Sequence, residues 1–239
     1  MCGIAGFVND MPIDVKCPVL QRMTDMIAHR GPDSEGHYID EHAALGHRRL
    51  SIIDLGGGQQ PIYNEDGSKV ITFNGEIYNY QTLREELIAA GHTFTTKSDT
   101  EVLLHGYEQW GVDLLQRVRG MFTFVIWDKN KQELFGARDH FGIKPFYYAK
   151  MNGTFMYASE IKSLLRHPDF VKELNAEALK PYMTFQYPAI GETFFKGVYK
   201  LPEGHYFTYR DGKMDIHRYY DEDFREGKQK LGELVNSID

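Results

Sequence analysis

The sequence contains little cysteine: Cys2 and Cys17 are its two thiols among 239 residues. Two cysteines cannot build the disulfide framework of a small secreted domain, and their spacing is not that of a zinc site. We therefore expect no metal site in this chain. We also predict that the protein works in a reducing compartment, the cytoplasm.

The sequence also lacks a long hydrophobic run. No segment approaches the roughly 20 apolar residues that cross a bilayer, and no basic region followed by an apolar stretch opens the chain. Lysine and arginine form no run longer than a pair, and the formal net charge is −7. Such a chain is a poor ligand for a nucleic-acid backbone. We therefore expect neither a membrane nor a nucleic acid as a partner.

The composition that remains is that of a folded globular protein. Hydrophobic residues make up 42% of the chain and charged residues 26%. Short apolar segments that predict strands alternate with segments in which apolar residues recur at helical spacing. One such helix carries Val19, Leu20 and Met23, and Pro18 is expected in its first turn, where a missing N–H costs nothing.

Cys2 is the most informative single residue. If Met1 is removed, Cys2 carries both a thiol and a free α-amino group. An α-amine has a reference pKa of about 7.7–8.0, so it can accept the thiol proton near neutral pH without a histidine. The alternative is that Cys2 is merely the second residue of a buried strand over residues 2–8.

Two arginines stand within a predicted strand over residues 46–54. An arginine at the mouth of a cleft can hold a carboxylate by two parallel hydrogen bonds, a geometry that lysine cannot reproduce. Either Arg48 or Arg49 could take this role. The alternative is a strand end that faces solvent.

Asn74 and Gly75 follow a predicted strand over residues 70–73. Asn-Gly after a strand normally forms a turn. A side-chain amide and a neighbouring glycine N–H, both fixed at a strand end, are also the donors from which an oxyanion hole is built. Both interpretations stay open at this point.

Asp99 lies in the first turn of a predicted helix. Ser98 and Glu101 fit a capping box at the start of that helix. The helix dipole alone accounts for an acidic residue there. The functional alternative is that Asp99 binds the ammonium group of a substrate.

Taken together, these segments resemble a known family. They follow the order of the N-terminal glutaminase domain of glutamine-hydrolysing asparagine synthetases, which are class II glutamine amidotransferases, and the resemblance covers residues 2–220. The series begins with Cys-Gly-Ile-Ala-Gly at residues 2–6 and continues with residues 29–36, 49–54, 60–61, 74–79, 98–101, 119–122, 138–145 and 159–162. Gly-Pro-Asp-Ser and Asn-Gly-Glu-Ile-Tyr-Asn favour the asparagine branch of the class.

The resemblance implies a fold and a reaction. The fold is α+β, a four-layer α/β/β/α sandwich of two antiparallel sheets, as in N-terminal nucleophile hydrolases. The Cys2 thiolate would attack the side-chain amide of L-glutamine, with its own α-amine as base. Asn74 and Gly75 would hold the oxyanion, and water would hydrolyse the resulting thioester to glutamate.

The resemblance also implies a set of substrate-binding residues. Arg49 would take the α-carboxylate of glutamine, and Glu76 with Asp99 would take its α-ammonium. The complete set is Arg49, Leu50, Ser51, Ile52, Ile53, Asn74, Gly75, Glu76 and Asp99. No cofactor is expected in this domain.

One feature of the family is missing from the sequence. The asparagine synthetases carry a Ser-Gly-Gly-x-Asp-Ser loop in a second domain that binds ATP and Mg²⁺, and no such loop occurs in these residues. We therefore expect residues 221–239 to be a linker toward a C-terminal synthetase domain that would use the ammonia, and we expect a homodimer. The alternatives are a glutaminase that feeds another amidation reaction and a non-catalytic scaffold of the same fold.

Overall fold

The computed structural model describes residues 1–51, 57–186 and 191–222, and its strands form two six-stranded antiparallel sheets. The first sheet has the strand order β10-β8-β9-β1-β3-β2, and the second has the order β12-β11-β7-β6-β5-β4. The strands of the first sheet are β1 (Gly3–Val8), β2 (Ser34–Ile39), β3 (Ala43–Arg49), β8 (Tyr147–Met151), β9 (Thr154–Ala158) and β10 (Val198–Lys200). Those of the second are β4 (Ile62–Tyr63), β5 (Lys69–Ile77), β6 (Gly120–Asp128), β7 (Glu133–Arg138), β11 (His205–Arg210) and β12 (Lys213–Arg218).

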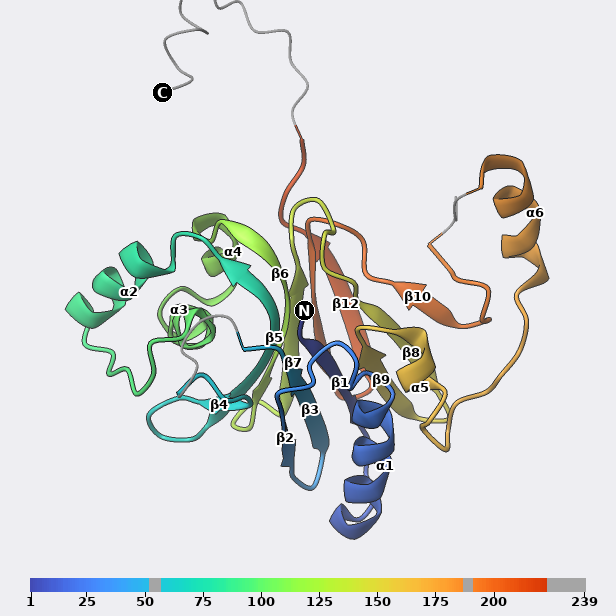
Figure 1. Ribbon diagram of the computed structural model, residues 1–239, viewed down its shortest axis with the longest axis horizontal. Coiled ribbons are helices and arrows are strands. Elements are labelled where there is room, and N and C mark those ends of the chain that lie inside the picture. Colours follow the sequence, from blue (N-terminus) through green and yellow to red (C-terminus); the bar gives the residue numbers. More distant parts are fainter. Residues whose placement is uncertain (52–56, 187–190, 223–239) are drawn as a thin grey trace, which may run out of the picture.

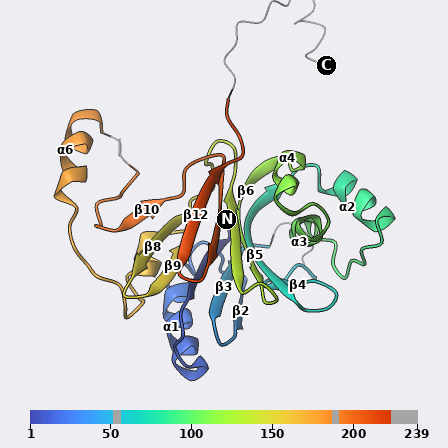
Figure 2. The same ribbon diagram turned by 180° about the vertical axis from the view of Figure 1, so that it is seen from behind.

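In the part of the chain that the structure describes, five helices pack on the outer faces of the two sheets: α1 (Ile13–Asp25), α2 (Tyr80–Ala89), α3 (Asp99–Trp110), α4 (Leu114–Arg117) and α5 (Ile161–Leu164), with a short 3₁₀ helix, η1 (Gly111–Asp113), before α4. A further helix, α6 (Ala176–Phe185), stands apart from both sheets. Figures 1 and 2 show α2, α3 and α4 on one flank of the molecule and α1, α5 and α6 on the other.

Buried apolar side chains form three clusters that define four layers. The central cluster lies between the sheets, where Ile4 and Leu45 of the first sheet meet Val125 and Trp127 of the second. A second cluster lies between the first sheet and α1 with α5, and a third lies between the second sheet and α2, α3 and α4. The predicted four-layer α/β/β/α sandwich is therefore confirmed.

The expected position of Pro18 is wrong. Helix α1 already begins at Ile13, so Pro18 lies inside the helix rather than in its first turn. A proline in a helix interior costs roughly 3 kcal/mol. Leu20 and Met23 are fully buried on the same helix, and burying each such side chain contributes about 1.5–3 kcal/mol. Packing on the first sheet thus offsets the cost of the proline.

The Asn74–Gly75 turn is also not formed. Strand β5 continues through both residues to Ile77 and pairs with β6, with Asn74 opposite Thr123 and Gly75 opposite Phe122. A side chain at position 75 would place its Cβ 2.2 Å from the Met121 carbonyl oxygen. Position 75 needs glycine because strand β6 approaches the backbone closely at this point. The pairing with β6 holds Asn74 and Gly75 at a fixed place in the sheet.

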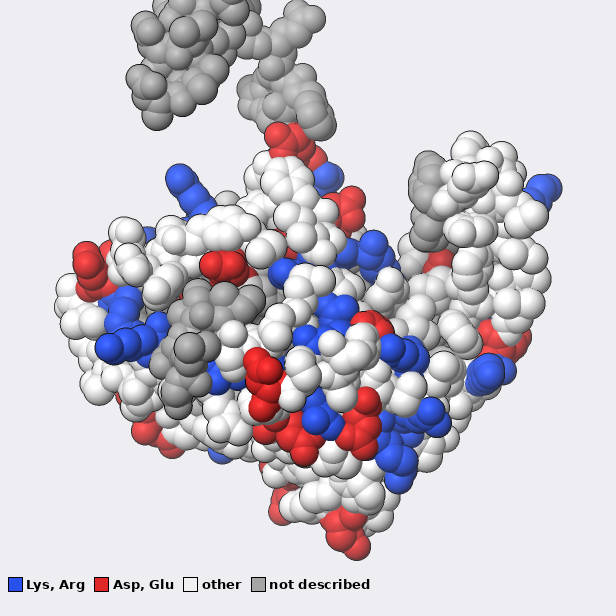
Figure 3. Space-filling view, viewed as in Figure 1, with Lys and Arg blue, Asp and Glu red and all other residues white. Residues whose placement is uncertain are grey.

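The surface charge of the face in Figure 3 is mixed. Basic and acidic side chains intermingle over the middle of that face and do not gather into one basic stripe, which a nucleic-acid backbone would need. Within the described ranges, no helix is long and apolar enough to cross a membrane.

His47 joins the two sheets beneath Asn74. It is fully buried on β3, and its Nε2 lies 3.0 Å from the backbone oxygen of Phe73 on β5. Its Nδ1 has no hydrogen-bond partner among the residues that the structure describes. Burial without a compensating carboxylate lowers the pKa of His47 to about 3, so the ring is neutral at physiological pH.

We expect the free energy of unfolding to fall as the pH drops below about 6.5, because the unfolded chain then binds a proton at His47 that the folded protein excludes until about pH 3. Between about pH 6.5 and pH 3, His47 lowers the free energy of unfolding by up to about 1.4 kcal/mol for each pH unit of acidification. Above about pH 6.5 it adds no pH dependence. Urea unfolding across the window should give a shallower slope for His47→Gln than for the wild type.

The matched control is His42→Gln. His42 is partly exposed beside Asp10, with 3.6 Å between Nδ1 and Oδ1, and its variant should keep the wild-type slope. Identical slopes for the wild type and His47→Gln would contradict the assignment.

Candidate active site

A cavity of about 290 Å³ lies beside the amino terminus, which Figure 1 places at the centre of the molecule. Its walls come from the starts of β1 and α3, the ends of β3 and β5, and the loop before β8. These segments are far apart in the sequence. The residues predicted for the site that line the cavity are Cys2, Arg49, Leu50, Asn74, Gly75, Glu76 and Asp99.

Of the other predicted residues, the structure describes only Ser51. Ser51 is not among the described residues of the cavity wall, and its N–H donates to Asp33 Oδ2 at 2.8 Å. Ile52 and Ile53 lie outside the described residues, as do residues 223–239 of the predicted linker. Strand β3 ends at Arg49 instead of extending to residue 54 as the pattern predicts.

Cys2 lines the cavity, and its sulfur has polar neighbours. Leu50 contacts that sulfur through its backbone, with the N–H 3.4 Å and the carbonyl oxygen 3.6 Å from Sγ. Arg30 Nε donates to the Cys2 carbonyl oxygen at 3.0 Å. Burial raises the pKa of the thiol, and the hydrogen bond from Leu50 opposes that rise. A thiol in this state needs a base close to its sulfur before it can attack a substrate.

Met1 shares the cavity with Cys2. Lys144 Nζ lies 3.1 Å from the Met1 sulfur, and both residues belong to the lining. While Met1 is attached, the nitrogen of Cys2 is a peptide amide and cannot accept a proton. Removal of Met1 would free an amine on the same residue as the thiol and would enlarge the space beside it.

Asn74 contributes a hydrogen-bond donor that has no acceptor. Its side chain is 1% exposed, and its Nδ2 has no partner in the part of the chain that the structure describes. Leaving a buried polar group unpaired costs about 1–3 kcal/mol. Because Asn74 and Gly75 line the cavity, this buried, unpaired donor lies at the cavity wall. The oxyanion interpretation of the pair is the one that this geometry favours.

The two neighbouring arginines point in different directions, as successive residues of a strand do. Arg49 is 7% exposed and lines the cavity. Arg48 extends away from it, and its Nη2 lies 2.5 Å from Asp25 Oδ1 and 2.6 Å from Glu35 Oε2. The residue that the family resemblance implied is therefore the one that the fold turns toward the cavity.

Two carboxylates, Glu76 and Asp99, line the same cavity as Arg49. Asp99 is 4% exposed, and its Oδ2 accepts the N–H of Ile77 at 3.0 Å. Burial raises the pKa of the Asp99 carboxyl, and the negative charge of Glu76 raises it further. A cation bound beside Asp99 would oppose this rise. Arg49 together with the two carboxylates matches the headgroup of an α-amino acid.

Ser98 caps α3, but the predicted capping box does not form. Ser98 Oγ accepts the N–H of Thr100 at 3.2 Å, whereas a capping box uses the N–H of Glu101. The Glu101 carboxylate does not return to Ser98: it accepts both backbone N–H groups of Thr95 and Thr96 at 2.7 Å. The segment before α3 passes close to Glu101, and its backbone N–H groups occupy both carboxylate oxygens in place of the N–H of Ser98.

Sequence reasoning assigned no role to two further residues of the cavity wall, Gln60 and Lys144. Gln60 Oε1 accepts the N–H of Phe73 at 2.6 Å, and its Nε2 donates to Thr100 Oγ1 at 3.2 Å, which ties β5 to α3. Burial and the charge of Arg30 lower the pKa of the Lys144 ammonium. Both residues lie in segments that carry the family resemblance, 60–61 and 138–145, and this membership could have indicated that they belong to the site.

Comparison with known proteins gives concordant results. A profile described as "Glutamine amidotransferase domain" matches residues 1–220. Asparagine synthetase [glutamine-hydrolyzing] 1 of Bacillus subtilis is 45% identical over 242 aligned positions that include all of this chain, and asparagine synthetase 3 of the same organism is 36% identical. Amidase chry2 of Gibberella zeae is 37% identical over 92% of the chain.

The chain spans only part of these relatives. It covers 38% of the length of B. subtilis asparagine synthetase 1, 39% of asparagine synthetase 3 and 34% of the amidase. Among solved structures, glutamine phosphoribosylpyrophosphate amidotransferase from B. subtilis matches with a TM-score of 0.67 at 16% identity, covering 92% of this chain and 50% of its own. This similarity establishes a shared fold.

Proposed function

The chain belongs to the glutamine amidotransferase domain family, and from this premise we propose that it hydrolyses L-glutamine to glutamate and ammonia with Cys2 as the nucleophile. Its homology to asparagine synthetases extends over its full length. The observation that carries the proposal is the unpartnered amide of Asn74 in the same cavity as the Cys2 sulfur.

In the first half of the reaction, the α-amine of Cys2 takes the thiol proton after Met1 has been removed. The thiolate attacks the side-chain carbonyl carbon of glutamine, and the negative oxygen that forms accepts hydrogen bonds from Asn74 Nδ2 and the Gly75 N–H. The C–N bond then breaks, and the protonated amine returns its proton to the departing ammonia. A γ-glutamyl thioester remains on Cys2.

In the second half, water replaces ammonia. The α-amine takes a proton from the water as its oxygen attacks the thioester, and the same donors hold the negative oxygen. The C–S bond breaks, glutamate leaves, and the Cys2 thiol recovers its proton. Every proton transfer uses groups of this chain, so we propose that no cofactor takes part.

Substrate selection would depend on the opposite charges of the cavity. Arg49 would hold the α-carboxylate in a two-pronged hydrogen bond, and Glu76 with Asp99 would hold the α-ammonium. Leu50 would contribute backbone atoms beside the sulfur. A compound that lacks either charged group would lose the charge-assisted hydrogen bonds made to that group, which weakens its binding.

Arg49→Lys is expected to raise the KM for glutamine by about 10- to 100-fold, because it removes one charged hydrogen bond worth about 1.5–3 kcal/mol. The value of kcat should change less, since the reacting carbon is not touched. Steady-state kinetics with Arg48→Lys as the matched control measures the effect. A raised KM for Arg48→Lys together with a normal one for Arg49→Lys would reverse the assignment.

The ammonia acceptor is a proposal that rests on the relatives. The asparagine synthetases are longer than this chain, and we propose that a C-terminal synthetase domain, with its own ATP and Mg²⁺, uses the ammonia to make asparagine from aspartate. A cytoplasmic location and a homodimer belong to the same proposal. Purified chain supplied with glutamine should release glutamate without ATP.

Labelling of Cys2 tests the proposed nucleophile directly. Incubation with 6-diazo-5-oxo-norleucine, a reactive analogue of glutamine, should add one label per chain, and peptide mapping should place it on Cys2 of protein that has lost Met1. Excess glutamine should protect against labelling. Protein that keeps Met1 and takes up no label, yet binds glutamine, would support the scaffold function instead.

A further inference from the structure

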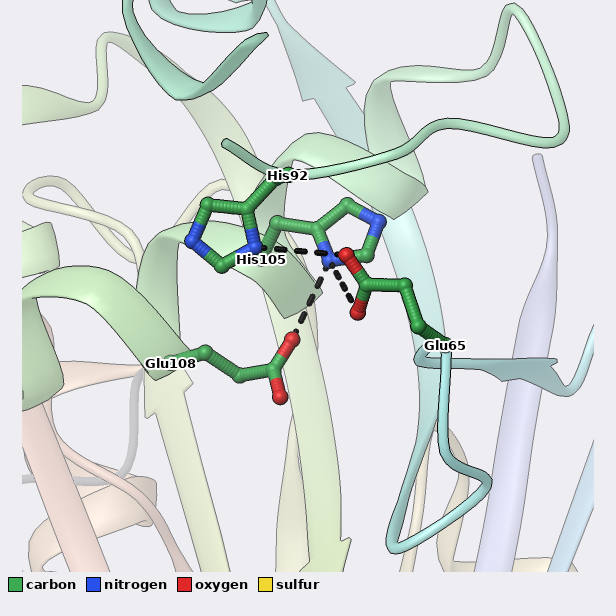
Figure 4. A group of neighbouring side chains, drawn as sticks. All are labelled: Glu65, His92, His105 and Glu108. Carbon is green, nitrogen blue, oxygen red and sulfur yellow. Dashed lines mark hydrogen bonds and ion pairs between the residues drawn. The ribbon is translucent and has the colours of Figure 1, made fainter. Parts of the chain in front are cut away.

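Four side chains that the proposed reaction does not use converge on the flank of α3 that faces away from the cavity. Glu65 comes from the β4–β5 connection, His92 from the α2–α3 connection, and His105 and Glu108 from the later turns of α3 (Figure 4). One ligand atom from each residue lies within 4.8 Å of all the others. We call these residues the His92–His105 cluster.

The separations between the ligand atoms are those of a metal site. His105 Nδ1 lies 3.1 Å from Glu108 Oε2 and 3.4 Å from Glu65 Oε2, and His92 Nδ1 lies 3.4 Å from Glu65 Oε1. A tetrahedral zinc ion with ligands at about 2.0–2.1 Å has ligand-to-ligand separations of roughly 3.4 Å. The remaining separations are all within 4.8 Å, so any that exceed the zinc value of roughly 3.4 Å would have to shorten when an ion binds.

One imidazole ring has a hydrogen-bond acceptor on its opposite side: His92 Nε2 lies 3.2 Å from Gln109 Oε1. His105 Nε2 lies 3.5 Å from Glu101 Oε1, and it makes no hydrogen bond with the residues that the structure describes. A proton held at Nε2 leaves the Nδ1 lone pair directed into the cluster. Outer partners of this kind fix the tautomer and orientation of metal-binding histidines.

The two carboxylates are held in the same way. Glu108 accepts the amide of Asn64 at 2.6 Å through Oε1, while its Oε2 faces His105. Glu65 accepts the N–H of Thr93 at 3.1 Å through Oε1. Three of the four side chains in the His92–His105 cluster thus accept or share a hydrogen bond with a neighbour outside it, which a chance meeting of surface charges does not require.

We propose that the His92–His105 cluster binds one divalent transition-metal ion, with Zn²⁺ as the best fit, through Nδ1 of both histidines and one oxygen each of Glu65 and Glu108. Two imidazoles with two carboxylates suit Zn²⁺, Co²⁺ or Ni²⁺, and they suit Mg²⁺ and Ca²⁺ poorly because those ions prefer oxygen ligands. The expectation of no metal site followed from the cysteines, and these ligands are of another kind.

The ion would join segments that are distant in the sequence. It would connect the β4–β5 and α2–α3 connections to α3, whose first turn carries Asp99 into the cavity. We therefore assign the metal a structural role: it fixes α3 in place and touches no reacting atom. The inference stands whether or not the chain hydrolyses glutamine.

Metal binding by the folded chain tests the proposal. Protein carrying Cys17→Ser, which removes the exposed thiol on α1, would be stripped with a chelator and titrated with Zn²⁺ by calorimetry in competition with a chromophoric chelator. We expect one ion per chain, a higher melting temperature with Zn²⁺ than with Mg²⁺, and visible absorption bands of tetrahedral Co²⁺ when Co²⁺ is used.

Two variants provide the comparison. His92→Asn, at a partly exposed position, should weaken Zn²⁺ binding by at least about 100-fold, since the loss of an outer partner alone costs about 10–100-fold. His42→Asn, in a surface pair with Asp10, should bind as the parent does. Equal Zn²⁺ affinity for parent and His92→Asn, or no binding by the folded parent, would show instead that a protonated His105 holds the carboxylates together.

Discussion

Replacing Cys2 with alanine is expected to lower the rate of glutamate release from glutamine by at least about 10⁴-fold. The covalent route ends with the sulfur, and losing the nucleophile of a comparable acyl-transfer enzyme costs a factor of this size or more. Alanine is as small as cysteine, so the removal of Met1 should continue. Glutamate release would be followed by a coupled assay in protein whose processing has been checked by intact mass.

Glutamine binding separates chemistry from folding in this variant. The cavity keeps Arg49, Glu76 and Asp99, so Cys2→Ala should still bind glutamine, and calorimetry can measure that affinity. Cys17→Ala is the matched control because Cys17 is an exposed thiol, and it should keep full activity. Wild-type turnover by Cys2→Ala would exclude the nucleophile and with it the proposed function.

Asn74→Ala is expected to lower kcat by about 100- to 1000-fold, with a smaller change in KM. This is the usual effect of removing one oxyanion donor, because the hydrogen bond is strongest when the negative charge has formed. The amide nitrogen of Asn74 makes no hydrogen bond with the residues that the structure describes, so no existing bond to that atom is lost. The melting temperature should therefore change little.

The test of Asn74 compares kcat, KM and thermal unfolding in one set of proteins. Asn130→Ala serves as the control, since Asn130 lies exposed in the turn after β6, and it should match the wild type in all three. A large drop in melting temperature for Asn74→Ala without any loss of kcat would mean that Asn74 supports the fold and not the reaction.

Local sequence reasoning proposes site residues where the relevant chemistry lies within a few residues. The thiol and the potential amine of Cys2 belong to one residue, and the donors of Asn74 and Gly75 are adjacent in the chain. The same kind of reasoning misplaced Pro18, and it left open an Asn-Gly turn that the structure does not form. In both cases a contact with a distant segment, β6 or the first sheet, outweighed the local preference.

The order of motifs by itself determined the family, the α+β class and the identity of the candidate nucleophile, because these depend on which residues occur and in what sequence. The tertiary structure decided that Arg49 and not Arg48 enters the cavity, and that Gln60 and Lys144 belong to its wall. It also brought together Glu65, His92, His105 and Glu108. The physical reason is that backbone preferences act over a few residues, whereas packing of two sheets and their helices sets which distant side chains meet.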